Sequence, residues 1–128
     1  MDISTLLQAI FKKDTSPKID KRFYDTIYAE VGGGDPQEVN AVASVFYNLT
    51  NDLGYEKALK RSSAYRKKSK EYEKASNSDF TEYEQYIYNR NKKIINDMLS
   101  NPDYIQSYTH LEIFKCLKYI NLTHLKFG

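Results

Sequence analysis

Apolar residues recur at helical spacing along most of the chain, which predicts an all-α protein. The first segment, residues 3–12, places its large apolar side chains on one stripe of a short amphipathic helix. A second helix is predicted over 20–32, where Phe23, Ile27 and Val31 recur every four positions. The three glycines that follow must end this helix, because glycine supplies the left-handed cap and resists continued helix.

The next predicted helix, 35–53, has unusually complete start signals. Asp35 can cap it, Pro36 fits the first helical position, and Glu38 completes a capping-box spacing. Apolar residues then follow at helical spacing until Gly54 ends the run. The sequence therefore predicts a helix hairpin with a very tight glycine connection.

The remainder of the chain is also predicted to be helical, with one irregular stretch. We expect a short helix at 55–60, and then a surface loop with one helical turn over 60–78, where the apolar periodicity is poor. A long helix is expected from about 80 to 100, started by Asp79 and Glu82 and ended by the sequence SNPD. Its apolar stripe is predicted to contain Phe80, Tyr83, Ile87, Ile94 and Met98, and a last helix is predicted at about 108–120.

Composition is consistent with one folded domain. With 128 residues, of which 41% are hydrophobic and 28% charged, we expect a single globular domain over 1–128 that begins with a helix and linker at 1–18. The net charge of +2 is too small to indicate a nucleic-acid binder by itself. We find neither a signal peptide nor the run of ~20 apolar residues that a membrane span needs.

The cysteine and the histidines suggest no metal chemistry. Cys116 is the only cysteine, which excludes an internal disulfide and a cysteine zinc cluster, and we expect it to be a buried, inert thiol. His110 and His124 have no ligand pattern around them. The three glycines do not form a phosphate loop, since no strand precedes them and no lysine with serine or threonine follows. We expect no metal and no cofactor.

Glu30 is the residue whose position suggests chemistry. It lies three residues after Ile27 and beside Val31, so part of its side chain faces the apolar stripe near the end of the helix. A carboxyl group partly withdrawn from water favours its protonated form, and the partial negative charge at a helix C-terminus acts in the same direction. Such a group suits a general acid that protonates a glycosidic oxygen. A surface glutamate paired with a lysine is the simpler interpretation of the same spacing.

The stretch RFYDTIYAEVGGGDPQEVNAVASVFYNL, residues 22–49, resembles the core motif of the spore-cortex-lytic type of cell-wall hydrolases. That family has an aromatic-rich helix that ends in alanine and a catalytic glutamate, then a glycine-containing turn and an alanine- and valine-rich helix that closes on asparagine. Here these elements correspond to Ala29-Glu30, the turn at 32–36 and Asn48. Leu49 stands where the family usually has arginine.

Later parts of the chain extend the resemblance, which spans about 20–128. The segment SSAYRKKSKEY is similar to the family's serine- and aromatic-bearing loop along the glycan groove, with Ser63 and Tyr65 as substrate-binding candidates. Tyr72 is a further candidate, either stacking on a sugar or covering the core. The closing LTHLKFG is similar to a threonine-histidine-aromatic element, with His124 in the histidine position and Leu125 where an aromatic ring is expected.

What the resemblance implies is a lysozyme-like α-helical enzyme that cleaves the β-1,4 bond between N-acetylmuramic acid and N-acetylglucosamine. In lytic transglycosylases of this type one glutamate, here Glu30, protonates the leaving oxygen, and the muramyl 6-hydroxyl closes an anhydro ring. Asn48 is expected to face Glu30 across the hairpin. A two-carboxylate hydrolase needs a partner ~5 to 9.5 Å away. Asp35 is the nearest candidate for that role, although it already has a capping role.

Two other functions stay open at this point. The first is a glycan-binding or virion structural module that has lost catalysis, suggested by Leu49 and Leu125. The second is a helical nucleic-acid-binding protein, suggested by residues 56–74, where eight Lys and Arg accompany three Glu and two tyrosines. That basic run can also meet the carboxylates of peptidoglycan peptides, or simply form a solvated surface.

We expect peptidoglycan glycan strands rather than nucleic acid as the partner, and a monomer unless the protein is built into a virion. The size of the chain and the missing signal suggest a bacteriophage lysin. Such a lysin is either carried in the virion or reaches the host periplasm or cell wall after its release. A secreted bacterial enzyme numbered without its leader is the alternative.

Overall fold

The computed structural model describes residues 18–108, which form six α-helices and one 3-10 turn and contain no strand. In chain order these are α2 (Lys21–Val31), α3 (Pro36–Leu53), α4 (Tyr55–Leu59), α5 (Ser63–Lys67), α6 (Lys70–Ser76), α7 (Glu82–Ser100) and η1 (Pro102–Tyr104). The predicted all-α fold is therefore confirmed. The helix predicted at 3–12 and all but the first residue of the helix predicted at 108–120 fall outside the described residues, as do His110, Cys116 and His124.

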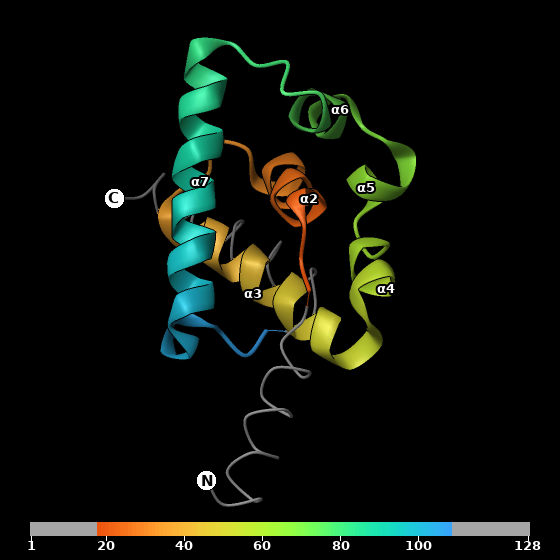
Figure 1. Cartoon of the computed structure of the whole chain (residues 1–128), viewed down its shortest axis with the longest axis vertical. Helices are drawn as coiled ribbons and strands as arrows, with labels where there is room; N and C mark the ends of the chain where they lie inside the picture. Colours follow the sequence, from red (N-terminus) through yellow and green to blue (C-terminus); the bar gives the residue numbers. More distant parts are fainter. Residues whose placement is uncertain (1–17, 109–128) are drawn as a thin grey trace, which may run out of the picture.

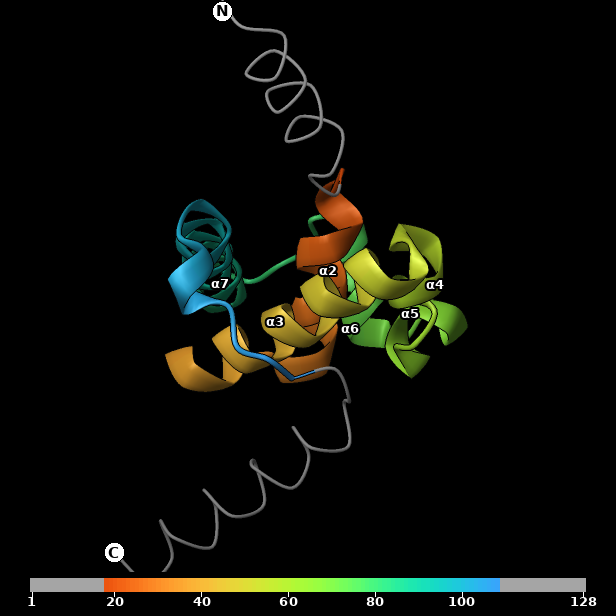
Figure 2. The ribbon, with the colours of Figure 1, turned by 90° about the horizontal axis from the view of Figure 1, so that it is seen from below.

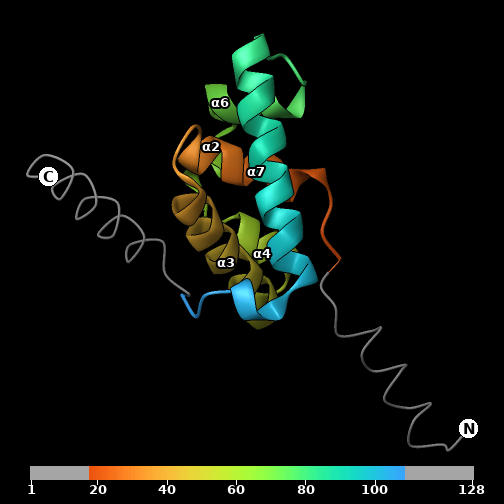
Figure 3. The same cartoon turned by 90° about the vertical axis from the view of Figure 1, so that its left-hand side faces the viewer.

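Helix α2 lies at the centre of the molecule (Figure 1). The long helix α7 lies on one side of it, and the three short helices α4, α5 and α6 lie on the other. Seen from below, α3 passes beneath α2 and connects the two sides (Figure 2). The side view shows that α7 runs across both α2 and α3 (Figure 3). Every other layer of the fold therefore packs against the helix that carries Glu30.

The main core forms between α2, α3 and α7. The stripe predicted from the sequence of α2 is buried, with Phe23 and Ile27 at 0% exposure. It packs with buried residues of the two long helices, namely Val39, Val42, Ala43 and Phe46 of α3 and Ile95 and Met98 of α7. Burial of such a cluster is the main favourable term in folding, and it fixes α2 between its two long neighbours.

The predicted hairpin is confirmed, with both helix boundaries within one residue of the prediction. Gly32 ends α2 with a φ of +50°, and its N–H donates to the carbonyl of Tyr28 at 2.7 Å. The carboxylate of Asp35 then caps α3 by accepting the N–H of Glu38 at 3.0 Å. Because the two caps are only three residues apart, the chain reverses direction immediately after Glu30.

Two side chains of α7 hold this turn in place. Asn91, which is 2% exposed, donates its side-chain amide to the carbonyl of Gly32 at 3.0 Å. The guanidinium of Arg90 donates to the carbonyl of Gly34 and, at 2.9 Å, to the side-chain oxygen of Asn91. Helix α7 therefore satisfies two carbonyls of the turn and fixes the end of α2.

The prediction of a surface loop over 60–78 was wrong. This stretch forms α5 and α6, each capped by a serine: Ser62 accepts the N–H of Tyr65, and Ser69 accepts the N–H of Tyr72, both at 3.2 Å. Lys68 separates the two helices in a left-handed conformation, with a φ of 51°. Helices this short bury only one or two residues each, so they leave no apolar periodicity in the sequence.

The start of α7 also differs from the prediction. Thr81 and Glu84 form the capping box, in place of Asp79 and Glu82. Tyr83, predicted on the apolar stripe, is 68% exposed. The helix nevertheless ends at Ser100, as the sequence SNPD predicted.

The chain after η1 lies along a polar stripe of α3. Asn40 donates to the carbonyl of Tyr104 at 2.9 Å, and the hydroxyl of Ser44 accepts the N–H of Gln106 at 2.9 Å. Asn48, one turn further along α3, donates to the carbonyls of Gln106 and Tyr108 at 2.7 and 2.8 Å. Three side chains spaced four residues apart thus hold the backbone of 104–108.

Candidate functional site

The candidate site is centred on Glu30, which is half-buried in the last turn of α2. One oxygen of its carboxylate accepts a hydrogen bond from the hydroxyl of Ser62, a residue at 0% exposure. The same hydroxyl oxygen accepts the N–H of Tyr65 as the cap of α5. Because that N–H occupies the oxygen as an acceptor, the hydroxyl proton is directed to Glu30.

An aromatic cluster places α5 against α2. Tyr65 and Tyr72 are both buried and pack edge to face, with ring centroids 5.5 Å apart, and Ala29 of α2 packs against their cluster. The ammonium of Lys68 lies 4.4 and 4.8 Å from the two ring centroids, within the range of cation–π attraction. Burial raises the pKa of the Tyr72 hydroxyl. These contacts fix the position of Ser62 opposite Glu30.

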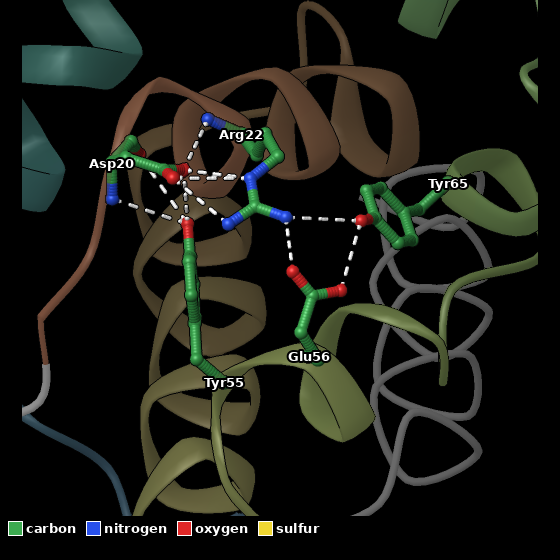
Figure 4. A network of polar contacts seen from close by, with 5 residues as sticks. All are labelled: Asp20, Arg22, Tyr55, Glu56 and Tyr65. Carbon is green, nitrogen blue, oxygen red and sulfur yellow. Dashed lines mark hydrogen bonds and ion pairs between the residues drawn. The ribbon is translucent and has the colours of Figure 1, made fainter.

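A polar network centred on Arg22 ties α2 to α4 and α5 (Figure 4). The guanidinium of Arg22 bonds the carboxylate of Asp20 at 2.9 Å, donates to Glu56, and donates to the hydroxyl of Tyr65 at 3.3 Å. That hydroxyl in turn donates to Glu56 at 3.3 Å. The bonds from Arg22 hold the pKa of Asp20 and the pKa of Glu56 below their ordinary values. Both groups are therefore held as carboxylates and are poor proton donors.

Tyr55 completes the network. Its hydroxyl donates to the carboxylate of Asp20 at 2.8 Å, and the Arg22 guanidinium lies 5.1 Å from its ring centroid. Burial raises the pKa of the Tyr55 hydroxyl, so it stays a neutral donor. The side chains labelled in Figure 4 thus connect the first turns of α2 and α4 with α5 through the guanidinium of Arg22.

The substrate-binding residues expected between 60 and 75 occupy other positions than predicted. Ser63 is exposed, and the preceding serine, Ser62, contacts Glu30 instead. Tyr65 and Tyr72 are 8% and 4% exposed, so neither presents a ring face to a sugar. The expectation that Tyr65 stacks on the glycan is therefore corrected, because its ring is used to pack α5 on α2.

Two further expectations concern the hairpin itself. Asn48 does not face Glu30, because its amide donates to the backbone of residues 106 and 108. Asp35 caps α3, as the sequence indicated, and its carboxylate is occupied by the N–H of Glu38. His124, the remaining candidate, lies outside the described residues.

The sequence did not indicate Ser62 or four residues of the polar network, namely Asp20, Arg22, Tyr55 and Glu56. Ser62 and Ser63 are adjacent, and only the register of α5 decides which one caps the helix. Arg22 could have been found from its spacing, since Arg22, Thr26 and Glu30 recur every four residues and lie on one face of α2. Thr26, the middle residue of this stripe, is fully buried, and Arg22 and Glu30 are half-buried on either side of it.

The surface around α4 and α5 is strongly basic. The exposed cations of the 56–74 run are Lys57, Lys60, Arg61, Arg66, Lys67, Lys68 and Lys70. Within 18–108 no group of three or more His, Cys, Asp or Glu is arranged to hold a metal ion. In the same residues, no helix combines the length and the apolar character that crossing a membrane requires.

Comparison with protein-family models, with curated proteins and with solved structures finds no match for this chain. We therefore infer its function from the residues around Glu30 and from the resemblance of residues 22–49 to the cell-wall hydrolases.

Proposed function

We propose that this protein cleaves the β-1,4 bond between N-acetylmuramic acid and N-acetylglucosamine in peptidoglycan, with Glu30 as general acid and base. The observation that carries the proposal is the hydrogen bond from buried Ser62 to half-buried Glu30 at the end of α2. The resemblance of residues 22–49 to the cell-wall hydrolases, which have a glycine-containing turn after the catalytic glutamate, supports it. On this proposal the protein acts at the bacterial cell wall.

The reaction needs one carboxyl group that first gives and then takes a proton. Ser62 donates to Oε1 of Glu30 and orients the carboxyl group, so in this scheme Oε2 is the atom that gives and takes the proton. In the first step this proton moves to the glycosidic oxygen as its bond to the muramyl C1 breaks. In the second step the carboxylate takes the proton of the muramyl 6-hydroxyl while that oxygen bonds to C1, which yields a 1,6-anhydro sugar. Water replaces the 6-hydroxyl in a hydrolase.

Three other carboxylates already have structural partners, which favours the transglycosylase scheme over a two-carboxylate hydrolase. Asp20 and Glu56 are both bonded to Arg22, and Asp35 accepts a backbone N–H as a helix cap. Each already has a structural partner, so Glu30 is the carboxyl group best suited to act on the glycan. A scheme with one acid and the substrate's own 6-hydroxyl needs no second carboxylate.

Digestion of purified peptidoglycan, with mass spectrometry of the soluble fragments, tests this proposal. We expect the wild type to release anhydromuropeptides, Glu30→Gln to release none, and the exposed control Glu82→Gln to match the wild type. Fragments with reducing ends would show cleavage by a hydrolase and would make Asp35 the partner to test. If a folded wild type releases neither kind of fragment, the proposal is wrong.

A glycan-binding module without catalysis is the second candidate. The observation that favours it is the position of Asn48, which binds the 106–108 backbone and not Glu30. On this alternative the protein binds insoluble peptidoglycan but releases no fragments, and Glu30→Gln binds as the wild type does. Co-sedimentation with peptidoglycan, run beside the digestion, distinguishes the two candidates.

A further inference from the structure

The charge of this chain is unevenly distributed. Residues 57–70, which we call the basic segment, contain seven of the 19 Lys and Arg residues and none of the 17 Asp and Glu residues. The basic segment therefore carries a formal charge of +7, and because the whole chain carries +2, the remainder carries −5. The seven cations are Lys57, Lys60, Arg61, Arg66, Lys67, Lys68 and Lys70. The small net charge of the chain thus conceals one strongly positive surface.

The positive charge of the basic segment is not neutralised by the described part of the chain. All seven cations are exposed, and within 18–108 none of them forms an ion pair with a carboxylate. The acidic residues that flank the segment have other roles. Glu56 is bonded to Arg22, and Glu71 lies in the first turn of α6, where a carboxylate stabilises the helix. The cations are therefore free to attract an anionic partner.

The fold gathers these cations on one side of the molecule. The basic segment runs from α4 through α5 to the first residue of α6, on the side of α2 opposite α7 (Figure 1). Two cations are also held by neighbours: the guanidinium of Arg66 donates to the carbonyl of Lys60, and the ammonium of Lys68 lies over the buried rings of Tyr65 and Tyr72. Side chains that are ordered beforehand lose less conformational entropy when a partner binds.

The side chains of this surface favour a phosphate backbone over nucleic-acid bases or a lipid surface. Tyr65 and Tyr72 are buried, so neither ring can stack on the bases of a single strand. The exposed large hydrophobic residues of 18–108 are Tyr83, Tyr86 and Tyr104, all outside the basic segment, so the segment has no large apolar side chain to insert into a membrane. What it offers a partner is cations, which contact phosphates and carry no base specificity.

We propose that the basic segment binds double-stranded nucleic acid through its backbone phosphates, without base specificity. A duplex carries one negative charge per ~1.7 Å of its axis, which matches a dense group of cations that lack carboxylate partners. The inference is argued from charge and does not rest on the proposed function. Ser62, within the same segment, is buried and contacts Glu30, whereas the cations face solvent, so a bound duplex leaves the contact between Ser62 and Glu30 in place.

Binding of the full chain to a fluorescently labelled DNA duplex of about 20 base pairs, measured by anisotropy over a range of salt concentrations, tests the proposal. We expect the logarithm of the association constant to fall linearly with the logarithm of the salt concentration. A slope of about −3 to −4 corresponds to about four phosphate contacts. Two duplexes of unrelated sequence are expected to bind equally well.

A double variant of the basic segment is compared with a matched double variant of α7. Lys60→Gln combined with Lys67→Gln is expected to weaken duplex binding about tenfold or more at about 100 mM salt, and to make the slope shallower by about 2. Lys92→Gln combined with Lys93→Gln removes the same charge from exposed positions on α7 and is expected to bind as the wild type does. All four positions are exposed, so both variants are expected to keep the wild-type melting temperature.

The inference is overturned if the folded wild type does not bind the duplex, or if the variant at Lys60 and Lys67 binds it as the wild type does. It is also overturned if the α7 variant loses as much affinity, since net charge alone then drives binding. Vesicles that contain phosphatidylglycerol are the parallel probe, and binding to them without binding to the duplex would assign the surface to a membrane instead. Wild-type protein that binds the duplex as expected but releases no peptidoglycan fragments would support this inference and contradict the proposed function.

Discussion

The hydroxyl of Ser62 donates a hydrogen bond to Glu30 and accepts one from the N–H of Tyr65, so one buried side chain joins the proposed acid to the start of α5. Ser62 therefore has two structural roles. As a cap it stabilises α5, and as a donor it orients the carboxyl group. Changes at this position should therefore affect stability and catalysis together.

Ser62→Ala removes both hydrogen bonds. We expect it to lower the free energy of unfolding by about 1 kcal/mol, the usual cost of a lost N-cap. We also expect the turnover number on peptidoglycan to fall about tenfold, with little change in KM, because the carboxyl group loses its orientation while the glycan contacts remain. Urea unfolding and steady-state digestion measure the two effects. Ser63→Ala is the control, and a loss of activity there with normal activity in Ser62→Ala would contradict this assignment.

The conformation of Gly32 makes a second prediction. Its φ of +50° is one that other residues adopt only with strain, so Gly32→Ala should destabilise the fold by ~1–2 kcal/mol. Gly33 provides a matched control in the same turn, because a methyl group there meets nothing closer than 4.0 Å. Thermal unfolding of both variants tests this, and equal melting temperatures would contradict the strain argument.

A third prediction concerns the buried carboxylate of Asp25, which is 2% exposed. It accepts a hydrogen bond from the Tyr88 hydroxyl at 2.8 Å and forms an ion pair with Lys21 at 3.0 Å. Tyr88→Phe removes one partner from a buried charged group, so we expect a loss of ~1–3 kcal/mol in the free energy of unfolding. Tyr86→Phe, at an exposed tyrosine of the same helix, should change it little. Urea unfolding compares the two variants, and equal free energies of unfolding would show that the Tyr88 bond adds no stability.

The pH dependence of stability tests the contact between α6 and α7. Glu84 accepts a hydrogen bond from the N–H of Thr81 and forms an ion pair with Lys74. Together these contacts lower the pKa of Glu84 from 4.5 to about 2. Because this pKa is lower in the folded than in the unfolded state, the group stabilises the fold above about pH 4.5. That contribution is lost as the pH falls from about 4.5 towards 2.

Glu84→Gln should therefore be less stable than the wild type at about pH 7, and the difference should shrink as the pH is lowered to about 3. Urea unfolding at both pH values measures this, with Glu82→Gln as the control on the same turn. A difference between Glu84→Gln and the wild type that stays constant with pH would show that the ion pair and the cap do not act through the charge of Glu84.

The parts of the fold that could be predicted are those with local signals. The hairpin was predicted because Asp35, Pro36 and the three glycines act through their own backbone neighbours. Helices α5 and α6 were not predicted, since they contain only five and seven residues. Their buried positions, Tyr65 and Tyr72, are set by packing against α2, which no local periodicity reveals.

The site was predictable to a similar extent. The half-buried position of Glu30 followed from its place beside the apolar stripe, but its partner depended on a one-residue choice between Ser62 and Ser63. Asn48 was wrongly placed because its partners, residues 106–108, are distant in sequence. Tyr83 fitted the apolar spacing of α7 equally well, and only the arrangement of α7 across α2 and α3 leaves it in water.

The most direct measurement of the central claim is the rate at which Glu30→Gln releases anhydromuropeptides from peptidoglycan, compared with the wild type at equal folded concentration. General acid–base catalysis contributes roughly a hundredfold or more to such rates, so we expect at least about a hundredfold loss while the Glu82→Gln control keeps the wild-type rate. A Glu30→Gln variant that cleaves within a few-fold of the wild-type rate would contradict the assignment of Glu30 as the acid.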